Sequence, residues 1–435
     1  MRSRTPWRLA AATTATVAAL AATAACGSGD SSSSKKADSH AKVTLSFQWW
    51  GNDDRAKATQ KAVDLFHSLH PNITVRTSYS DYASYFQKLS TQVAGGSAPD
   101  VFQLDRATVA DYAGRNQLAD LSSPSATGVH HDQFDGRILS GAKIKGVLYG
   151  LPAGQTTQMI AYHPADWQAA GATAPAAGWT WNEFFAAAQK LYQASGGKVT
   201  GTTDFGWAID WFELWLVEHG KRLYTDDSRV AFSSAQLTQF WNLTKKFRDT
   251  GAASRAEDTS PMDGSMPHSA FVKKRSYSEL NYDSSFTAYA SATGQPVAAG
   301  PIPTDTGRSG NVIQPSTMLS EYKHTKHPAE AGMLIDFLAN DVRAGKILGV
   351  VRGLPGNRKV RAAIAASLTG PDKAVLDYET QVARNVSPAP PPWPRGSATL
   401  KRDFQTIYDD VIFGRISVQA GVDRVMSTAR NDIQQ

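Results

Sequence analysis

The fold is decided by the stretch Val43-Thr-Leu-Ser-Phe47, which runs directly into Gln48-Trp-Trp-Gly-Asn-Asp-Asp54. The first part alternates apolar and polar residues, a pattern that predicts a strand, and the second part predicts a loop at the carboxyl end of that strand. Apolar residues then recur at helical spacing from Ala58 to Leu69, until Pro71 ends the pattern and a second strand begins at Ile73. A strand, a helix and a strand in this order predict a mostly parallel sheet covered by helices.

The same alternation continues along the chain. A helix over 82–93 is followed by the breaker Gly95-Gly-Ser-Ala-Pro99 and by a third strand over 100–105. Helical spacing also marks 181–192, 329–339 and two segments of the C-terminal tail. The 435 residues are enough to bury the cores of two domains, so we expect an α/β fold with two lobes.

The first residues read as an export signal. Arg2, Arg4 and Arg8 precede an alanine-rich apolar run over 9–20, and we expect a signal peptide over residues 1–25. The alternative, a membrane-spanning helix, is disfavoured because a span needs roughly 20 apolar residues. Removing residues 1–25 takes away three arginines and no acidic residue, which lowers the formal net charge from +6 to +3.

Cys26 is the only cysteine of the chain. It follows Leu20-Ala-Ala-Thr-Ala-Ala and precedes Gly27, a setting that resembles a lipobox but carries Thr23 where leucine is usual. We expect lipidation of Cys26 and a flexible tether over 26–42; the alternative is a cysteine discarded with the signal peptide. The folded part then holds no disulfide and depends on core burial for its stability.

Several function classes are disfavoured by the sequence. Basic and acidic residues are interspersed, without the basic cluster that a nucleic-acid groove needs, so we expect no nucleic-acid partner. The ten histidines are scattered and include no His-Glu-x-x-His pattern, so we expect neither a metal nor another cofactor. The sequence lacks a Gly-x-Ser-x-Gly nucleophile motif and a phosphate-binding loop.

Seven short motifs occur in order along the chain: Trp49-Trp-Gly-Asn-Asp53, His70-Pro-Asn-Ile-Thr-Val75, Gly95-Gly-Ser-Ala-Pro-Asp-Val101, Tyr149-Gly-Leu-Pro152, Trp179-Thr-Trp-Asn-Glu-Phe184, Arg352-Gly-Leu-Pro-Gly-Asn357 and Phe413-Gly-Arg-Ile-Ser417. This ordered set resembles the family 1 extracellular solute-binding proteins, in particular the lipoproteins that bind maltose or oligosaccharides for ABC sugar importers. The resemblance implies a two-lobed periplasmic-binding-protein-like fold with hinge crossovers and a ligand cleft between the lobes. We expect one lobe from 43–152 plus 313–350 and the other from 153–312 plus 351–435.

Residues at the carboxyl ends of the predicted strands are candidates for ligand contact, because ligands of α/β sheets bind at that edge. A sugar needs aromatic platforms together with carboxylates and amides. At least one of the two adjacent tryptophans is expected in the core, since neighbours on a strand point to opposite faces. The carboxylate of Asp105 is the first choice, with capping of the helix over 108–112 as its alternative role. The candidates in this half of the chain are Trp49, Trp50, Asn52, Asp53, Asp81, Tyr82, Gln103 and Asp105.

The second half of the chain adds six candidates. Trp207, Trp211 and Trp215 recur at every fourth residue, as one stripe of a helix would, and we assign the first two to ligand stacking and the third to the core. The resemblance assigns a ligand-facing polar and aromatic pair to Tyr282 and Asp283. Arg352 is expected to bind hydroxyls or a carboxylate, or else to fix its own turn with a salt bridge. Trp393 lies in a proline-stiffened loop.

The sequence therefore predicts an exported, lipid-anchored and monomeric receptor on the outer face of the cell membrane. Its partners are a sugar or oligosaccharide and the permease subunits of an ABC importer, and it catalyses no reaction. Two alternatives remain open. One is a secreted hydrolase that uses a carboxylate pair such as Asp53 and Asp105, and the other is a sugar sensor or adhesion receptor with a histidine-kinase partner.

Overall fold

A six-stranded mixed sheet forms around the stretch that begins the described part of the chain, residues 42–390 and 392–433 of this computed structural model. The strand order is β11-β6-β10-β3-β1-β2. The β2-β1-β3 end is parallel, as the strand, helix and strand pattern predicts, whereas β10, β6 and β11 pair antiparallel. The strands are β1 (Val43–Trp50), β2 (Ile73–Ser80), β3 (Val101–Leu104), β6 (Leu151–Thr156), β10 (Gln314–Glu321) and β11 (Leu354–Pro355).

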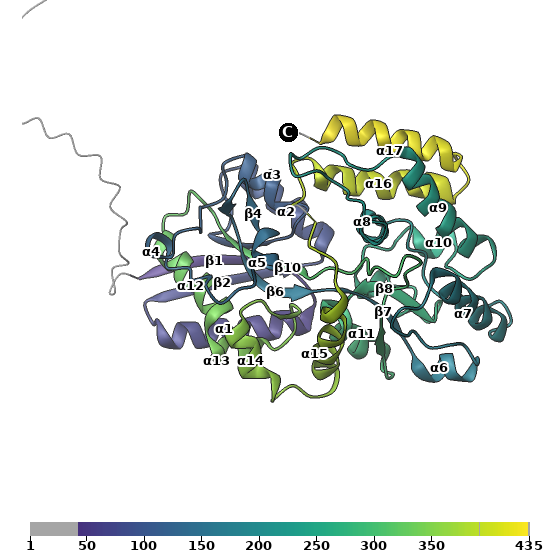
Figure 1. Cartoon of the computed structure of the whole chain (residues 1–435). Coiled ribbons are helices and arrows are strands. Elements are labelled where there is room, and N and C mark those ends of the chain that lie inside the picture. Colours follow the sequence, from purple (N-terminus) through teal and green to yellow (C-terminus); the bar gives the residue numbers. More distant parts are fainter. Residues whose placement is uncertain (1–41, 391, 434–435) are drawn as a thin grey trace, which may run out of the picture. The chain divides into compact units, whose positions relative to one another are not determined.

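Helices cover this sheet and complete the first lobe. α1, α12 and α13 pack on one another, and α2 packs on β1 and β2 (Figure 1). Alternation along β1 sends Leu45, Phe47 and Trp49 into the core. The remaining elements of this lobe are α1 (Asp53–Leu69), α2 (Tyr82–Ala94), α3 (Val109–Gly114), α4 (Pro124–Thr127), α5 (Gly136–Ser140), β4 (Lys143–Ile144), β5 (Val147–Leu148), α12 (Pro328–Asn340), α13 (Val342–Leu348) and α14 (Arg358–Ala365).

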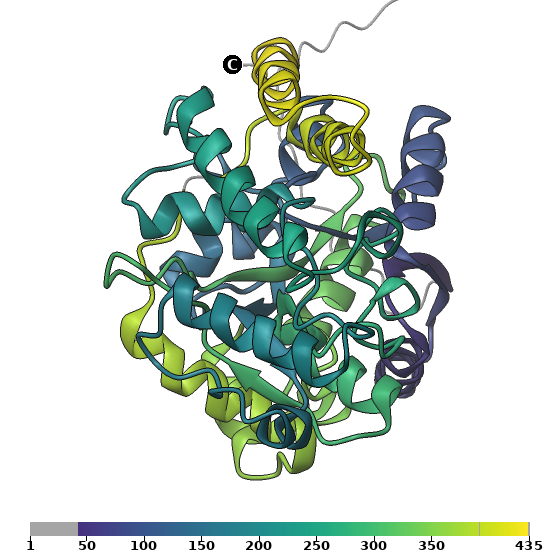
Figure 2. The same ribbon diagram turned by 90° about the vertical axis from the view of Figure 1, so that its right-hand side faces the viewer.

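A second core forms around a three-stranded antiparallel sheet of order β8-β7-β9. Its strands are β7 (Gln158–Tyr162), β8 (Ser278–Tyr282) and β9 (Ala298–Gly300). The helical elements of this second lobe are α6 (Pro164–Ala169), α7 (Trp181–Ala194), α8 (Ile209–Glu218), α9 (Ser234–Asp249), α10 (Ala256–Thr259), η1 (Met266–His268), η2 (Asp283–Ser285), α11 (Phe286–Thr293), α15 (Gly370–Val382), η3 (Ala383–Asn385), α16 (Ser397–Ile412) and α17 (Val418–Asp432). Figure 2 shows α16 and α17 together, in yellow.

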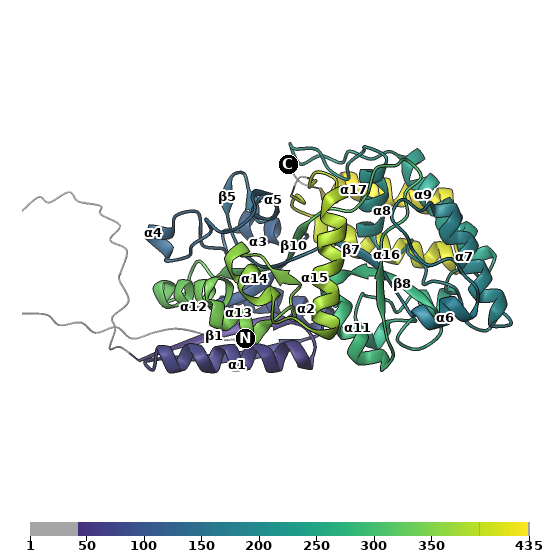
Figure 3. The same ribbon diagram turned by 60° about the horizontal axis from the view of Figure 1, so that its bottom comes forward.

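The two sheets are joined by a short crossover. β6 ends at Thr156 in the first sheet and β7 begins at Gln158 in the second, so Thr157 alone separates them. The side chain of Asn311, just before β10, accepts from the backbone nitrogen of Gln158 at 2.7 Å and donates to its carbonyl at 2.8 Å. This amide fastens two chain crossings to each other. Figure 3 shows α15 beside them, and Tyr378 of α15 donates to the same carbonyl at 2.5 Å.

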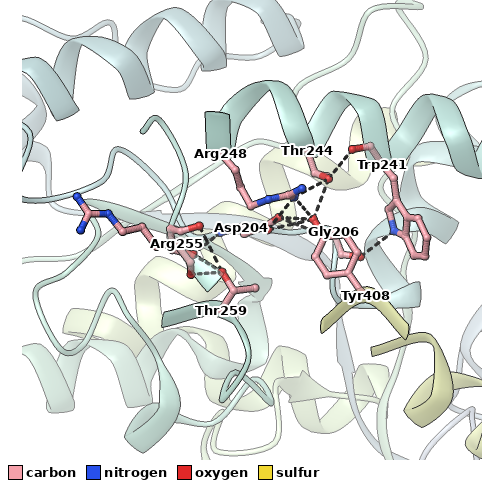
Figure 4. A network of polar contacts seen from close by, with 9 residues as sticks. Asp204, Gly206, Trp241, Thr244, Arg248, Arg255, Thr259 and Tyr408 are labelled. Atoms are coloured by element: carbon pink, nitrogen blue, oxygen red, sulfur yellow. Dashed lines mark hydrogen bonds and ion pairs between the residues drawn. The ribbon is translucent and has the colours of Figure 1, made fainter. Parts of the chain in front are cut away.

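A buried ion pair holds the second lobe together at α9 and α16. The carboxylate of Asp204 is 3.0 Å from the guanidinium of Arg248 and accepts from the Tyr408 hydroxyl at 2.9 Å. Figure 4 shows both side chains pointing toward Asp204. Burial and then the Asp204 charge raise the pKa of Tyr408 well above its usual range, so the phenol stays a donor. The interaction joins the loop before α8 to α9 and α16.

The predicted helices at 82–93, 181–192, 329–339 and in the tail are confirmed as α2, α7, α12, α16 and α17. The prediction that Trp207, Trp211 and Trp215 lie on one helix is wrong for Trp207, because α8 begins at Ile209. Among the described residues, no helix has the length and apolar character that crossing a membrane requires. The predicted signal peptide, Cys26 and all of the tether except Lys42 lie outside the described residues.

Candidate functional site

Asp105 stands at the carboxyl edge of the first sheet, directly after β3. Its Oδ2 accepts from the Tyr82 hydroxyl at 2.6 Å, and its Oδ1 accepts from the backbone nitrogens of Ala107 and Thr108, each at 3.0 Å. Asp105 therefore caps the turn before α3 and also binds a side chain of α2. Burial raises the pKa of Tyr82 well above its usual range, and the Asp105 charge adds to the shift. The phenol consequently remains a hydrogen-bond donor.

The next residue, Arg106, links the first lobe to α8 of the second. Its guanidinium forms a two-pronged ion pair with Glu213, at 3.1 and 3.2 Å, and also donates to the side-chain oxygen of Gln314. The indole nitrogen of Trp393 donates to the same Glu213 carboxylate at 2.9 Å, and Arg106 lies 5.4 Å from the Trp393 ring centre. Burial lowers the pKa of Arg106, but Glu213 and its other neighbours outweigh that effect and the pKa is raised. The ion pair keeps Arg106 charged.

A second ion pair lies beside the first. Lys401 of α16 is 3.1 Å from the carboxylate of Asp210, which also accepts from the Tyr282 hydroxyl at 2.8 Å. The ring of Trp211 packs 5.4 Å from that of Tyr282. The ammonium of Lys401 lies 5.7 Å from the Tyr82 ring centre. Burial raises the pKa of Asp210, but Lys401 and Tyr282 more than offset it, so the net shift is downward.

These contacts define one group of side chains, here called the junction cluster. It joins the edge of the first sheet to α8, β8 and α16, so that residues of both lobes meet. It combines aromatic faces with paired carboxylates, cations and an amide, which is the mixture that the ring faces and hydroxyls of a saccharide require. Its members are Tyr82, Asp105, Arg106, Asp210, Trp211, Glu213, Tyr282, Gln314, Trp393 and Lys401.

Five of the predicted candidates meet in this cluster: Tyr82, Asp105, Trp211, Tyr282 and Trp393. Trp50 borders it, because its half-buried ring packs edge-on against Tyr82 with ring centres 5.5 Å apart. The cluster gathers aromatic residues that lie up to 311 positions apart in the sequence, between Tyr82 and Trp393. The tertiary fold alone brings them together.

Three further candidates form a second group at the same edge. Gln103 accepts from the Arg352 side chain at 3.2 Å, and the Arg352 guanidinium lies 5.8 Å from the ring centre of Trp49. The three side chains are buried, and Trp49 belongs to the core of the first lobe with 1% exposure. Trp49 is thus the member of the tryptophan pair that points into the core, as the alternation along β1 requires.

The exposed candidates Asn52, Asp53 and Asp81 lie at helix starts. Asn52 caps α1 by accepting from the backbone nitrogen of Arg55 at 3.0 Å, and Asp81 caps α2 by accepting from that of Ser84 at 2.9 Å. Asp53, the first residue of α1, accepts from the Tyr79 hydroxyl at 3.0 Å. The Ser84 hydrogen bonds lower the pKa of Asp81, as capping predicts. In this structure Asn52 and Asp81 cap helices, and Asp53 holds the hydroxyl of Tyr79 on β2.

Asp283 is fully buried at the crossover. Its carboxylate accepts from the hydroxyls of Thr156 and Thr157, each at 2.6 Å, and from the Thr157 nitrogen at 3.0 Å. Burial raises the pKa of Asp283 to about 6, although these hydrogen bonds oppose the shift. All of these hydrogen bonds are made to the segment that connects β6 and β7. The remaining candidate, Trp207, is buried in the core of the second lobe.

The sequence reasoning missed five polar members of the cluster, four charged and one neutral: Arg106, Asp210, Glu213, Lys401 and Gln314. A signal existed for two of them. Asp210 and Glu213 stand three residues apart in Ile209-Asp-Trp-Phe-Glu-Leu-Trp215. All the remaining residues of this segment are apolar, and the helix is almost wholly buried. A carboxylate inside such a helix requires a partner, which marks it as part of a polar site.

The described residues offer no group of three or more His, Cys, Asp or Glu side chains that would hold a metal ion. The five charged members of the junction cluster are all engaged in ion pairs or hydrogen bonds with one another and with tyrosines or Trp393. In this structure these contacts join the two lobes to each other.

Comparison with known proteins identifies the family. The family model described as bacterial extracellular solute-binding protein matches residues 61–371. The chain belongs to the bacterial extracellular solute-binding proteins. Its resemblance to that family, seen in the ordered motifs, is thereby confirmed, and so is the two-lobed α/β fold.

Individual relatives agree with this assignment. A family 1 extracellular solute-binding protein of Alicyclobacillus acidocaldarius is 30% identical and covers 92% of this chain and 100% of its own, with a TM-score of 0.65. A periplasmic oligogalacturonide-binding protein of Yersinia enterocolitica, in complex with saturated digalacturonic acid, is 23% identical and covers 90% of this chain and 100% of its own, with a TM-score of 0.78. An uncharacterised lipoprotein of Streptomyces antibioticus is 32% identical over 154 residues, which span about a third of this chain (34%) and of that relative (34%).

Proposed function

We propose that this solute-binding protein is the extracytoplasmic receptor of an ABC importer and that its solute is a sugar or oligosaccharide. The observation that carries the proposal is the junction cluster, where aromatic rings and paired polar groups from both lobes converge. A receptor of this kind catalyses no reaction and needs no cofactor. The oligogalacturonide-binding relative supports a saccharide as the solute class.

The proposed mechanism is lobe closure. The crossover at Thr157 and the neighbouring segment at Asn311 form the hinge of this proposal. The proposed division is 43–152 plus 313–350 and 153–312 plus 351–435, except that all of β6 together with β11 and α14 belongs with the first sheet. A saccharide first contacts one lobe, and closure brings Trp211, Tyr282 and Lys401 of the second lobe against it. Binding shifts the equilibrium toward the closed form, which the permease subunits recognise.

Export and anchoring complete the proposal. We expect cleavage after residue 25 and a lipid on Cys26, which would hold a monomeric receptor at the outer face of the cell membrane. The lipoprotein of Streptomyces antibioticus supports this part. Mass spectrometry of the protein extracted from membranes should find a diacylated Cys26 at the new N-terminus, and an unmodified or missing Cys26 would refute the anchor.

A thermal-shift screen against mono-, di- and oligosaccharides tests the receptor function. A ligand that binds only the folded state must raise the melting temperature, by an amount that grows with its concentration. We expect a shift with one saccharide class and no consumption of that sugar. The appearance of hydrolysis products would make the protein an enzyme, and no shift with any saccharide would exclude sugars as the solute.

Asp105 provides the test at the level of the site. The Asp105→Ala variant leaves the Tyr82 hydroxyl without its acceptor and removes a carboxylate from the cluster, so we expect saccharide binding to weaken by roughly 1–3 kcal/mol. The control is Asp64→Ala, an exposed position of α1 outside the cluster. Isothermal titration calorimetry that found equal affinities for Asp105→Ala and the wild type would remove Asp105 from the site.

A further inference from the structure

Two arginines beside the junction cluster have no acidic partner among the described residues. Arg55 donates to the backbone carbonyls of Val351 at 2.8 Å and Trp50 at 2.9 Å. Arg352 donates from Nε to the neutral side chain of Gln103 at 3.2 Å. It is 6% exposed, and its Nη2 is buried without a hydrogen-bond partner. The indole nitrogen of Trp49, over whose ring Arg352 lies, is a second buried donor without a partner.

This pair differs from three of the protein's other buried cations. Arg106, Arg248 and Lys401 each stand 3.0–3.1 Å from a carboxylate. Burial lowers the pKa of Arg352 well below its usual range, and the nearby Arg55 charge lowers it further; burial also lowers the pKa of Arg55 to about 10. A buried charge without a counter-charge is costly, and proteins usually provide one. Among the described residues, no carboxylate forms an ion pair with Arg55 or Arg352.

The free atoms are all donors. Guanidinium and indole N–H groups cannot accept a hydrogen bond, so the partner that satisfies them must be an acceptor, and an anionic oxygen satisfies the charge as well. Gly51 helps to make the arrangement possible, because a Cβ at that position would lie 2.6 Å from Cδ of Arg55. A side chain there would push Arg55 aside.

The pair is continuous with the junction cluster. Gln103, which holds Arg352, precedes Asp105 by two residues, and Trp50, whose carbonyl holds Arg55, packs on Tyr82. A solute that occupies the cluster therefore lies next to the two arginines. The carboxylates of the cluster already have partners in Arg106, Lys401 and Tyr82, so they do not neutralise this pair.

We infer that Arg352, Arg55 and Trp49 form a subsite for an anionic group of the solute, which makes the preferred ligand a saccharide that bears a carboxylate, as a uronic acid does. This inference rests on the proposed function as a saccharide receptor. A free small anion, not attached to a saccharide, could bind the same three side chains. Arg352 also lines a cavity of about 20 Å³, together with Phe47 and Leu319.

The test compares matched ligands and matched variants. Mono-, di- and trisaccharides of galacturonic, glucuronic and mannuronic acid are titrated against their methyl esters, which keep the ring and lose the charge. We expect the wild type to bind one acid about 10- to 100-fold more tightly than its ester, the range of charge-assisted hydrogen bonds. Arg352→Met and Arg55→Met should lose most of this preference, and Arg352→Lys should recover part of it. Arg76→Met removes the same charge from an exposed position of β2 and should keep the preference.

The melting temperature of the ligand-free protein distinguishes a ligand-binding role of Arg352 from a structural one. Arg352→Met removes an unpaired buried charge, so the ligand-free variant should melt no lower than the wild type. A lower melting temperature together with an unchanged preference for the acid would assign Arg352 a structural role and overturn the inference. If Arg352→Met fails to fold, Arg55→Met tests the subsite instead, and the measurement is then its preference for the acid over the methyl ester.

The remaining outcomes separate this inference from the proposed function. Binding of neutral sugars and esters as tight as that of the acids would overturn the anionic subsite and leave the saccharide receptor intact. Failure of every saccharide, charged or neutral, would overturn both. Stabilisation of the wild type by sodium chloride or sodium acetate alone, lost in Arg352→Met but not in Arg76→Met, would assign the subsite to a free anion and overturn the uronic acid.

Discussion

At the scale of the residue, Glu213 accepts from two donors at once, the guanidinium of Arg106 and the indole of Trp393. The Glu213→Gln variant removes the negative charge and leaves the buried Arg106 without a counter-charge. We expect this to lower the free energy of unfolding by about 3–5 kcal/mol, measured by urea denaturation.

The control for Glu213 is the double variant Arg106→Met with Glu213→Leu, which replaces the pair by apolar side chains of similar size. It should regain most of the lost stability, because no buried charge is left unpaired. Equal losses in the single and double variants would mean that packing around these positions, and not the ion pair, determines the cost.

Glu321 at the end of β10 predicts a pH dependence of stability. Its side chain is 4% exposed with Oε2 unpartnered, and burial, followed by the Asp100 charge, raises its pKa from 4.5 to about 8. Between these two values the folded state binds more protons than the unfolded state, so stability falls as the pH rises. Glu321→Gln should therefore leave the free energy of unfolding nearly unchanged at pH 5 and raise it by a few kcal/mol at pH 9.

Denaturation of the wild type, Glu321→Gln and the exposed control Glu257→Gln across this pH range checks that expectation. The difference between wild type and Glu321→Gln should grow with pH, and the difference for Glu257→Gln should stay small throughout. A constant difference for Glu321→Gln would show that the carboxyl does not titrate in this window.

At the scale of the element, the approach of α16 to the loop before α8 depends on Gly206. A Cβ at this position would overlap the hydroxyl of Tyr408, which is held by Asp204 and Arg248. Gly206→Ala should force the helix or the tyrosine to move and lower the free energy of unfolding by about 1–3 kcal/mol. Gly136→Ala is the control, because a Cβ there would meet no atom within 4 Å.

At the scale of the whole molecule, lobe closure predicts a change in size. Small-angle X-ray scattering should record a smaller radius of gyration when the stabilising saccharide is added, since a population of open molecules shifts to the closed form. A saccharide that leaves the melting temperature unchanged should leave the radius unchanged as well. A radius that does not respond to a tightly bound saccharide would contradict closure as the mechanism.

The sequence predicted the helices and strands better than it predicted the members of the site. The helices and the parallel strands β1, β2 and β3 were predictable, since periodicity and breakers act over a few residues. The aromatic half of the junction cluster was also found. Tyr82 follows a predicted strand, Trp211 belongs to a helical pattern, and the family resemblance indicated Tyr282. Arg106 and Lys401 were missed, because a charged residue in a soluble protein usually lies at the surface and only its burial distinguishes it.

By itself, the sequence determined the alternation of strands and helices, because periodicity depends on local spacing along the chain. The two-lobed architecture was implied by the length of the chain and by the resemblance of its ordered motifs to a known family. Only the tertiary structure decided which polar groups meet. Asp105, Asp210 and Lys401 come from three distant segments. Arg106 pairs with the carboxylate of Glu213, whereas the side-chain partner of Arg352 is the neutral Gln103. Pairing and burial are properties of distances in space, which the order of residues does not contain.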